Sequence, residues 1–348
     1  MGQGALEEAE GRLTAWLGGR TVFTLSSAPV LEHQGDWLGP LTRTAARTVT
    51  LMAPDGEAAK RLPVAEGLWQ EMLAAGGKRD SRLIAFGGGT VGDLGGFLAG
   101  CYARGIEYVQ VPTTLLAQAD AAIGGKTGVD LPGGKNIVGL FHHPHAVVVD
   151  PRPLASLPLR EWRCGAVEIL KIALAEDAAL FERVEEVWGG LLQGEVAAAL
   201  AVLPGAIAAK IRIVEADPEE GDRRRVLNLG HTLAHALEAA ADYHGLRHGE
   251  AVAYGLLFAL RLATRRGLDA VTARRVRELL RWLELPPLPP ISVEGLMALM
   301  RRDKKARESG LPWVLPRALG VVDPAAVLLE DEVRRQLEAF LHDPRRDS

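Results

Sequence analysis

Residues 83–100 read LIAFGGGTVGDLGGFLAG, and this stretch decides the fold. It joins an apolar run, a glycine-rich turn and the start of a helix. Gly87, Gly89 and Gly92 fit the pattern GxGxxG, in which glycines let backbone amides approach a pyrophosphate at a helix N-terminus. Only Glu107 represents the acid expected on the next strand, so the match is weak by itself. Tight packing of strand against helix without a ligand is the alternative.

Short β-branched runs and helical stretches alternate around this motif. The runs cover residues 21–25, 47–52, 83–86, 106–111 and 146–149, and this alternation predicts a parallel α/β sheet. From about residue 160 the apolar residues recur with a 3.6-residue period, over 176–193, 195–215, 229–241, 248–266 and 270–283. The sequence therefore predicts a Rossmann-like α/β domain with a parallel sheet, residues 1–158, followed by an all-α domain, residues 159–348. Pro151, Pro153 and Pro158 mark the junction.

Composition excludes several classes of partner. Of 348 residues, 48% are hydrophobic, and 40 Lys and Arg against 44 Asp and Glu leave a net charge of -4, which provides no basic field for nucleic acid. The longest apolar stretch, 196–209, contains Pro204 and is shorter than the roughly 20 residues of a membrane span. Only two cysteines occur, and the acidic N-terminus has no signal pattern, so we expect a cytoplasmic protein without a membrane partner.

A second polar turn, PDGEAAK at residues 54–60, follows the end of another predicted strand. Loops at the carboxyl ends of parallel strands lie at one edge of the sheet. The two turns are therefore predicted to enclose a nucleotide together.

The segment VPTTLLAQADAAIGGKTGVDLPGGKN, residues 111–136, places hydroxyls, an acid, two lysines and an amide on glycine-rich loops. It is not a nucleoside-triphosphate loop, because Asp120 stands where GxxxxGK[ST] requires glycine. With Arg104 upstream, the segment predicts a cationic basin for a small phosphorylated substrate. A solvated charged loop is the alternative.

The segment NLGHTLAHALE, residues 228–238, puts His231 and His235 on one helical face, and His248 follows in HGEAVAYG. Imidazoles from adjacent helices plus one carboxylate, available at Glu168, are typical of a catalytic zinc site with an open position. The histidines could instead cap helices or pack. His142, His143 and His145 surround Pro144, and we interpret them as structural or solvent-facing.

Two further polar sets frame this segment. From Glu220, a spacing of four leads to Arg224 and Asn228, so a helix would align the three on one face, with Lys210 upstream. A salt-bridge ladder is the simpler explanation for Glu220 and Arg224. Asp303, Lys304 and Lys305 form a late charged turn that is either a site element or a surface patch.

Taken together, the motifs resemble the 3-dehydroquinate synthases, members of the sugar-phosphate cyclases, from about residue 20 to residue 322. The resemblance rests on GGGTVGDLGGF, YVQVPTTLLAQADAAIGGKTGVDLPGGKN, LNLGHTLAHALE, HGEAVA and DKK in this order. It implies that NAD contacts Asp55, Gly56, Glu57, Lys60, Gly89, Thr90, Val91, Gly92, Asp93, Thr113, Thr114, Lys126, Lys135, Pro153, Leu154, Ala155 and Ser156.

The same resemblance implies a divalent metal, zinc or cobalt, held by Glu168, His231 and His248, with His235 facing the substrate. The implied substrate contacts are Arg104, Asp120, Lys126, Lys135, Asn136, Lys210, Glu220, Arg224, Asn228, His235 and one of Lys304 or Lys305, with Lys304 preferred. The implied reaction converts 3-deoxy-D-arabino-heptulosonate 7-phosphate, a small phosphorylated sugar acid, to 3-dehydroquinate and phosphate in the shikimate pathway. A homodimer is also implied.

The chain departs from the family pattern at one informative position. The family usually has Asp or Asn after the first strand, to meet the adenosine ribose, whereas this chain has Ser26 and Ser27. The rival interpretations are a metal-dependent polyol dehydrogenase, a cyclase for substrates without a carboxylate, and a non-enzymatic nucleotide-binding scaffold.

Overall fold

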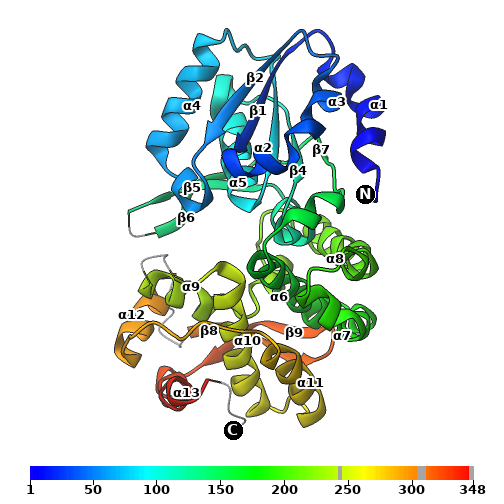
Figure 1. Cartoon of the computed structure of the whole chain (residues 1–348). Coiled ribbons are helices and arrows are strands. Elements are labelled where there is room, and N and C mark those ends of the chain that lie inside the picture. The colour runs from blue at the N-terminus through cyan, green and yellow to red at the C-terminus, as the bar shows by residue number, and fades with distance from the viewer. Residues whose placement is uncertain (133, 242–244, 304–310, 345–348) are drawn as a thin grey trace. The chain divides into compact units, whose positions relative to one another are not determined.

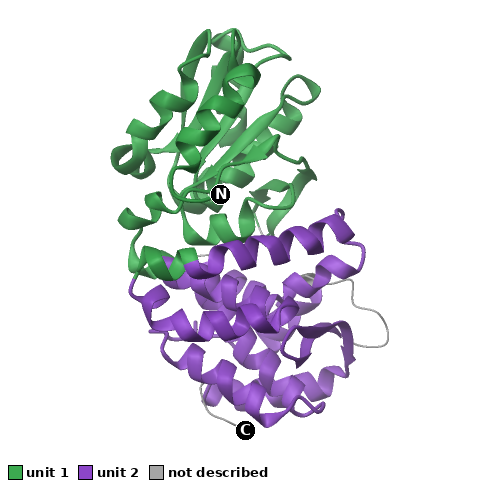
Figure 2. Cartoon of the chain, turned by 90° about the vertical axis from the view of Figure 1, so that its right-hand side faces the viewer, with its two compact units in different colours: residues 1–161, 194–200 green, residues 162–193, 201–348 purple. Residues whose placement is uncertain are grey.

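The computed structural model describes residues 1–132, 134–241, 245–303 and 311–344. The chain forms two compact units (Figure 2). Unit 1 comprises residues 1–161 and 194–200, and unit 2 comprises residues 162–193 and 201–348.

Unit 1 is built on a five-stranded parallel sheet (Figure 1). Its strands, in the spatial order β2-β1-β3-β4-β7, are Arg47–Ala53, Thr21–Ser27, Arg82–Gly87, Tyr108–Pro112 and Ala146–Val147. The predicted parallel sheet is therefore confirmed. The chain passes from β1 to β2 on one side and then to β3 on the other, so the strand order reverses between β1 and β3. Ligands of open α/β sheets bind at such a switch point, outside the carboxyl ends of the strands.

Both faces of this sheet are covered, which explains why β1, β3 and β4 are buried along nearly their whole length. Phe23 and Leu83 face a core that includes residues of α4 (Leu62–Ala74) and α5 (Gly89–Cys101). Val22 and Ile84 face the opposite core, with residues of α1 (Ala5–Leu17) and α3 (Leu38–Thr42). The remaining helices of this half are α2 (Ala28–Gln34) and the short turns η1 (Gly35–Trp37), η2 (Gly56–Ala59), η3 (Tyr102–Arg104), η4 (Ala117–Ala121) and η5 (Arg152–Ser156).

A hairpin was not predicted within the glycine-rich segment. Strand β5 (Lys126–Leu131) pairs antiparallel with β6 (Gly134–Phe141), from Lys126 opposite Phe141 to Leu131 opposite Gly134. These strands were not predicted from the sequence, because glycine and charged residues are uncommon in β-strands and weaken the pattern that indicates one.

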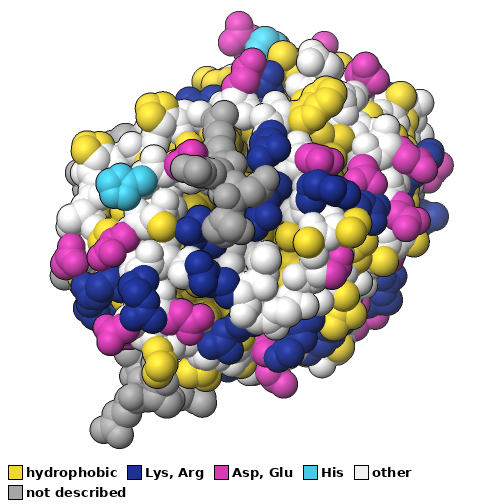
Figure 3. All heavy atoms as spheres, turned by 90° about the horizontal axis from the view of Figure 1, so that it is seen from below, with side chains coloured by type: hydrophobic (Ala, Val, Ile, Leu, Met, Phe, Trp, Pro, Cys, Tyr) yellow, Lys and Arg dark blue, Asp and Glu magenta, His cyan; other side chains and the backbone are white. Residues whose placement is uncertain are grey.

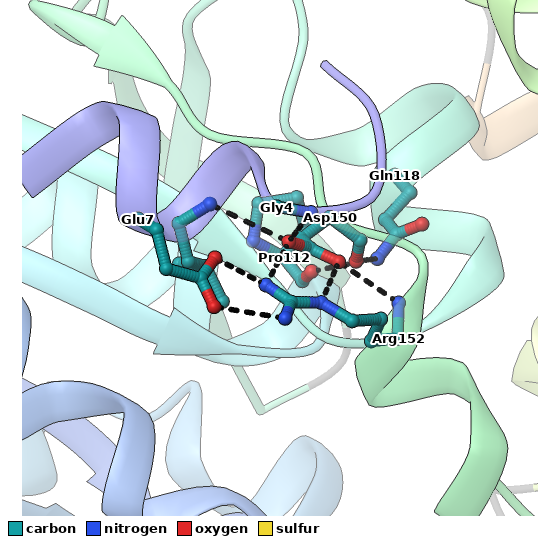
Figure 4. A network of polar contacts seen from close by, with 7 residues as sticks. Gly4, Glu7, Pro112, Gln118, Asp150 and Arg152 are labelled. Atoms are coloured by element: carbon teal, nitrogen blue, oxygen red, sulfur yellow. Dashed lines mark hydrogen bonds and ion pairs between the residues drawn. The ribbon is translucent and has the colours of Figure 1, made fainter.

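A buried carboxylate joins the start of α1 to the segment after β7 (Figure 4). Asp150 Oδ2 accepts hydrogen bonds from the amides of Gly4 (3.1 Å) and Leu6 (3.4 Å), and Asp150 Oδ1 accepts one from Nε of Arg152 (3.0 Å). Arg152 also donates to Glu7 (2.8 Å) and lies over the Trp37 ring. This network anchors η5 at the carboxyl edge of the sheet.

Unit 2 is mostly helical, as predicted. Its helices are α6 (Leu159–Glu176), α7 (Ala178–Leu192), α8 (Val196–Ala216), the 3-10 turn η6 (Arg223–Asn228), α9 (His231–Ala240), α10 (His248–Thr264), α11 (Ala270–Arg281), α12 (Val293–Asp303) and α13 (Glu330–His342); the first residues of α6 and α8 belong to unit 1.

The all-α expectation for this half needs one addition. Strands β8 (Leu311–Ala318) and β9 (Val321–Leu328) form an antiparallel hairpin. Trp313 of this hairpin packs against Phe258 of α10, with ring centroids 5.5 Å apart. Both strands contain proline, which is uncommon within β-strands, and the sequence therefore did not predict them.

Helix α8 is the one helix among the described residues that is long and apolar enough to cross a membrane. It continues through Pro204, and 44% of its most apolar window is buried. The buried positions Ala199, Val202, Leu203 and Ala206 recur at helical spacing. That stripe is typical of a core helix in a globular protein.

The face of the molecule drawn in Figure 3 mixes basic and acidic side chains. Several such pairs join elements of unit 2, as Arg334 of α13 does with Glu294 of α12 at 3.0 Å. Because basic and acidic side chains are mixed, the described residues of this face form no continuous positive patch of the kind that binds the phosphate backbone of a nucleic acid.

Candidate functional site

The loops after the strands of unit 1 gather the residues predicted to contact NAD. Asp55, Gly56, Glu57 and Lys60 follow β2, Gly89–Asp93 follows β3, and Thr113 and Thr114 follow β4. Residues 153–156 lie in η5, after β7. Because all five strands are parallel, these segments share the carboxyl edge of the sheet.

Helix α5 begins at this edge with an open N-terminus. Gly88 is the N-cap residue, and no side chain caps the helix. The amides of its first turn therefore remain available to an anion. Gly92 serves packing as well, because an added Cβ would lie 2.5 Å from Oε1 of Gln110. Gly92 therefore has a packing role, while the uncapped first turn of α5 fits the pyrophosphate of a dinucleotide.

Charged side chains link the β2 loop to α5 and to the β5–β6 hairpin. The buried Lys60 donates to Asp93 Oδ2 at 2.7 Å and to the side-chain oxygen of Asn136, and Lys135 donates to Glu57 at 3.0 Å. Burial alone would lower the pKa of Lys60, but the carboxylates of Asp93 and Glu57 outweigh burial and raise it. The structure therefore brings Lys135 and Asn136 to the predicted cofactor loops.

Other predicted substrate residues of unit 1 lie elsewhere. Lys126 is at the opposite end of the hairpin, five residues or about 16 Å along the strands from the level of Asn136. Asp120 lies in η4, half-buried, after the β4 loop. Arg104 is exposed in η3, with φ 64°, in the turn that leads into the amino end of β4. The cationic basin is therefore not one compact cluster within unit 1.

Glu107 does not serve as the acid of a dinucleotide motif. It directly precedes β4, at the amino edge of the sheet, whereas nucleotides bind at the carboxyl edge. Its carboxylate pairs with Arg82 at 2.6 Å and accepts a hydrogen bond from Trp16 at 3.3 Å. The sequence pattern misled here because it does not reveal at which edge of the sheet a residue lies.

Ser26 and Ser27 end β1, beside the switch point, and both are buried. The hydroxyl of Ser26 donates to the carbonyl oxygen of Phe86 on β3, at 2.8 Å. Of the two serines in the stretch where the resemblance leads us to expect Asp or Asn, Ser26 is thus used to join two strands.

His142 and His145 have structural surroundings, in line with their interpretation from the sequence. The ring of His142 stacks on Tyr108, with centroids 5.2 Å apart, and its Nε2 lies 3.0 Å from the carbonyl oxygen of Ile106. The ring of His145 stacks on Trp16, with centroids 5.1 Å apart.

In unit 2, Glu168, His231 and His248 converge. Each offers one ligand atom, and these atoms all lie within 4.8 Å of one another. The side chain of Glu168 is fully buried, and among the described residues neither of its oxygens has a hydrogen bond of good geometry, although charged groups lie nearby. Two imidazoles and one carboxylate are the donor set of open catalytic zinc sites, so the residues fit a divalent ion.

Close backbone contacts hold the three helices that carry this metal triad. A Cβ on Gly249, next to His248, would lie 2.4 Å from Cα of Cys164 on α6, one turn before Glu168. A Cβ on Gly255 would lie 1.9 Å from the carbonyl oxygen of Gly230, the residue before His231. Only glycine permits both approaches, so α10 aligns the α6 and α9 ligands.

Hydrogen-bond acceptors orient both imidazoles. Nδ1 of His231 lies 3.2 Å from the carbonyl oxygen of Leu229, and Nδ1 of His248 lies 3.4 Å from Oε1 of the buried Glu238. Both acceptors keep a proton on Nδ1 and leave Nε2 for a metal, the usual arrangement around ligating histidines. Nε2 of His248 lies 3.4 Å from Oε1 of Glu168.

The surroundings shift the two histidines in opposite directions. Burial, with help from Lys171 and the neighbouring imidazoles, lowers the pKa of His231. Burial would also lower the pKa of His248, but the nearby carboxylates of Glu168 and Glu238 raise it to about 10. A neutral His231 is already in the form that ligates a metal.

Sequence reasoning missed Lys171 as a member of this cluster. Its ammonium lies 2.6 Å from Oε2 of Glu168, and both side chains are buried. Glu168 and Lys171 are three positions apart on α6, a spacing that brings side chains together on a helix. This spacing could have identified Lys171 from the sequence.

His235 lies beside the metal triad without joining it. Its ring centroid is 5.4 Å from that of His231 and 6.5 Å from that of His248. Among the described residues, the group whose ligand atoms lie within 4.8 Å of one another contains His231 and His248 but not His235, a choice that the spacing of the histidines left open.

The predicted helical face of Glu220, Arg224 and Asn228 is wrong in its geometry. Glu220 has φ 61° and lies in a turn, and Arg224 and Asn228 belong to the 3-10 turn η6. The residues still meet, because Nδ2 of Asn228 donates to Oε1 of Glu220 at 2.9 Å. Arg224 and Lys210 are buried. Lys304 and Lys305 lie outside the described residues.

Comparisons with known proteins agree with this arrangement. Residues 50–164 match the family described as 3-dehydroquinate synthase N-terminal, and residues 165–306 match 3-dehydroquinate synthase C-terminal. A 3-dehydroquinate synthase of Solibacter usitatus strain Ellin6076 is 42% identical over 326 residues, which cover 92% of this chain and 90% of that protein.

Two solved structures share the fold. The 2-epi-5-epi-valiolone synthase of Streptomyces hygroscopicus subsp. jinggangensis 5008, with NAD+ and Zn2+ bound, has a TM-score of 0.87 at 31% identity, covering 95% of this chain and 93% of that one. A 2-deoxy-scyllo-inosose synthase complexed with carbaglucose-6-phosphate, NAD+ and Co2+ has a TM-score of 0.87 at 25% identity, covering 97% and 95%.

Proposed function

Because the chain belongs to the 3-dehydroquinate synthase family, we propose that it converts 3-deoxy-D-arabino-heptulosonate 7-phosphate to 3-dehydroquinate and phosphate. The reaction is a transient oxidation, phosphate elimination, reduction, ring opening and aldol closure, without net change in the cofactor. The single observation that carries the proposal is the metal triad, whose ligand atoms lie within 4.8 Å of one another.

When bound, NAD accepts and returns a hydride, while a zinc or cobalt ion polarises the substrate hydroxyls. Glu168 would contribute the negative charge of the metal site, and His231 and His248 would contribute nitrogen donors through Nε2, His248 after losing the proton that its raised pKa retains without metal. Leu229 and Glu238 hold the Nδ1 protons, which keeps both rings oriented. The first turn of α5 and the loops after β2, β4 and β7 bind the dinucleotide.

The charged residues divide the remaining roles. Arg104 and Lys126 bind the phosphate, and Lys135 and Asn136, about 16 Å from Lys126 along the hairpin, bind the substrate where it meets the cofactor. Lys210, Arg224 and Asn228 bind the substrate carboxylate, and His235 faces the substrate. Asp120, Glu220 and Lys304 complete the substrate contacts. We also assign residues 1–158 to cofactor binding and residues 159–348 to metal and substrate binding.

We propose further that the protein acts as a homodimer in the cytoplasm, with no nucleic acid or membrane partner. Arg104 supports the dimer, because it is exposed in the turn before the amino end of β4, away from the predicted cofactor loops. In a dimer it acts on the substrate of the second copy. Mixing inactive Arg104→Ala and Lys126→Ala variants should then restore part of the activity, and no recovery after subunit exchange contradicts the shared site.

The test of the reaction mixes the purified protein with NAD and the heptulosonate phosphate and follows inorganic phosphate. We expect phosphate release without net NADH, abolished by a chelator and restored by zinc or cobalt. A sugar phosphate that lacks the carboxylate is the matched substrate control and should react poorly. Accumulating NADH with a simple polyol points to a dehydrogenase, and binding of NAD and metal without turnover points to a scaffold.

Lys126 gives the sharper variant for the phosphate role. Asn136 is hydrogen-bonded to Lys60 within the cofactor loops, so its loss affects both functions. Lys126→Ala should slow phosphate elimination more than it weakens NAD binding. Equal losses in single-turnover phosphate release and in NAD affinity count against the assignment.

A further inference from the structure

The carboxylate of Asp217 organises the turn between α8 and η6. Oδ1 accepts a hydrogen bond from the amide of Gly221 at 2.8 Å. Oδ2 accepts from the amides of Asp222 at 2.8 Å and Arg224 at 3.0 Å. One side chain therefore satisfies three backbone donors of a segment that has no regular partner for them.

The same turn carries side chains with proposed substrate roles. Glu220 adopts φ 61°, a left-handed conformation that is strained for a residue with a Cβ. Nη1 of the buried Arg224 donates to the carbonyl oxygen of Pro218 at 2.7 Å, and Asn228 donates to Glu220 at 2.9 Å. The turn is thus closed on itself, and the directions of Glu220 and Arg224 depend on the backbone that Asp217 holds.

We propose that Asp217 is a positioning residue for substrate binding, which fixes the turn so that Glu220, Arg224 and Asn228 point to one substrate. This inference rests on the proposed function, because only that function gives the three side chains a shared ligand. Asp217 itself does not touch the substrate. It acts through the backbone, by the three amides named above.

The chemistry requires a carboxylate at this position. Both oxygens act as acceptors, and an amide would replace one of them by a donor that faces N–H groups. The hydrogen bonds from the amides of Arg224, Asp222 and Gly221 lower the pKa of Asp217 to about 2, so the acceptors stay ionised at neutral pH. The nearly isosteric Asp217→Asn variant therefore removes the function of the side chain while keeping its volume.

The experiment compares Asp217→Asn with Asp269→Asn in the full-length protein. Asp269 is the matched control, because it also accepts a backbone hydrogen bond, from Thr272 at 2.8 Å, at the start of α11. Hydrogen exchange of peptides spanning residues 217–228 measures the order of the turn. Steady-state kinetics with the heptulosonate phosphate and zinc affinity measure the consequence.

We expect faster exchange of this turn in Asp217→Asn alone, with kcat/KM lower by about 10- to 100-fold, mainly through KM. Zinc affinity should stay at the wild-type value, because the metal triad is untouched. Wild-type exchange and wild-type KM in a folded Asp217→Asn overturn the proposal. If Asp217→Asn does not fold, hydrogen exchange of the wild-type protein is the test. Fast exchange of the amides of residues 221–224 would then overturn the proposal.

The proposed function and the positioning role of Asp217 can be refuted separately. If the wild-type protein releases no phosphate from the heptulosonate, the proposed function fails, while faster exchange in Asp217→Asn still identifies the anchor of the turn. If the wild-type protein turns over and Asp217→Asn exchanges faster with unchanged KM, the proposed function stands and the positioning role is excluded.

Discussion

A Cβ atom added to Gly255 would lie 1.9 Å from the carbonyl oxygen of Gly230. This contact brings the backbone of α10 against the residue that precedes His231, the first ligand on α9. Gly230 itself has φ 81°, which suits glycine far better than any other residue. The spacing of the metal triad therefore depends on two glycines that bind nothing.

Gly255→Ala should separate α9 from α10. We expect a loss of about 3 kcal/mol in the free energy of unfolding, the upper part of the range for overpacked cores, together with weaker zinc binding. Urea unfolding and zinc titration measure the two effects. Gly189→Ala on α7 is the control, since nothing lies within 4 Å of its added Cβ, and it should stabilise the helix. Equal zinc affinity in Gly255→Ala and wild type would contradict this role.

Glu238 should hold His248 in the orientation that binds metal. Removing the acceptor in Glu238→Ala is expected to weaken zinc binding about 10- to 100-fold, the usual effect of losing the partner of a ligating histidine. Glu238→Gln should lose less, because its amide oxygen can still accept from Nδ1. Competition with a chromophoric chelator gives the affinities. Gln336→Ala, which removes a buried hydrogen bond from Arg261 (3.0 Å), is the control and should bind zinc normally.

Lys171→Met should destabilise the metal-free protein by about 3 kcal/mol, because it leaves the buried carboxylate of Glu168 without its nearest cation. Zinc should recover part of this loss, since it replaces the missing charge. Thermal unfolding with zinc and with chelator measures both states. The double variant Glu168→Gln/Lys171→Met should be more stable without metal than Lys171→Met alone. Additive losses would show that the two side chains do not interact.

Asp150 should make the stability of the protein fall in acid. Burial by itself would raise its pKa, but hydrogen bonds from the Arg152 side chain and from backbone amides outweigh burial and lower it. The stabilisation is therefore complete above the unfolded pKa of about 3.9 and disappears as the pH falls through the lower folded value. Urea unfolding at several pH values between 5 and 3 gives the free energy of unfolding as a function of pH. This free energy should fall less steeply with decreasing pH in Asp150→Asn than in the wild type. The variant Asp36→Asn, at an exposed position, should show the same fall as the wild type.

Periodicity and strand alternation were sufficient to predict the sheet and most helices, because both faces of the sheet are buried and the helices carry apolar stripes. The β5–β6 and β8–β9 hairpins were not predicted, because the glycines of the first and the prolines within the strands of the second have low β propensity. Glu107 was the wrong candidate for the dinucleotide acid for another reason. Sequence order does not say at which edge of a sheet a residue lies.

Residue type and spacing predicted a metal site but left open which of His231, His235 and His248 bind the ion, and only the family resemblance implied the set with Glu168. The residues that support this set were not predicted. Lys171, Asp217 and Glu238 act on other groups of the protein, through an ammonium, three amides and an imidazole, and such partners emerge only when the backbone path is known. Glu220 and Asn228 meet through a turn with a left-handed residue, so the regular spacing of four identified residues that are in contact, although not on a helical face.

The Ser26 hydroxyl, engaged with the Phe86 carbonyl oxygen, has a practical consequence for handling the protein. Where the family resemblance led us to expect a carboxylate or amide for the sugar of the adenosine, β1 ends in two small, uncharged side chains, Ser26 and Ser27. A dye or resin linked through that sugar would therefore displace no ionic contact at this strand. Chromatography on ribose-tethered nucleotide should retain the protein and release it with free cofactor.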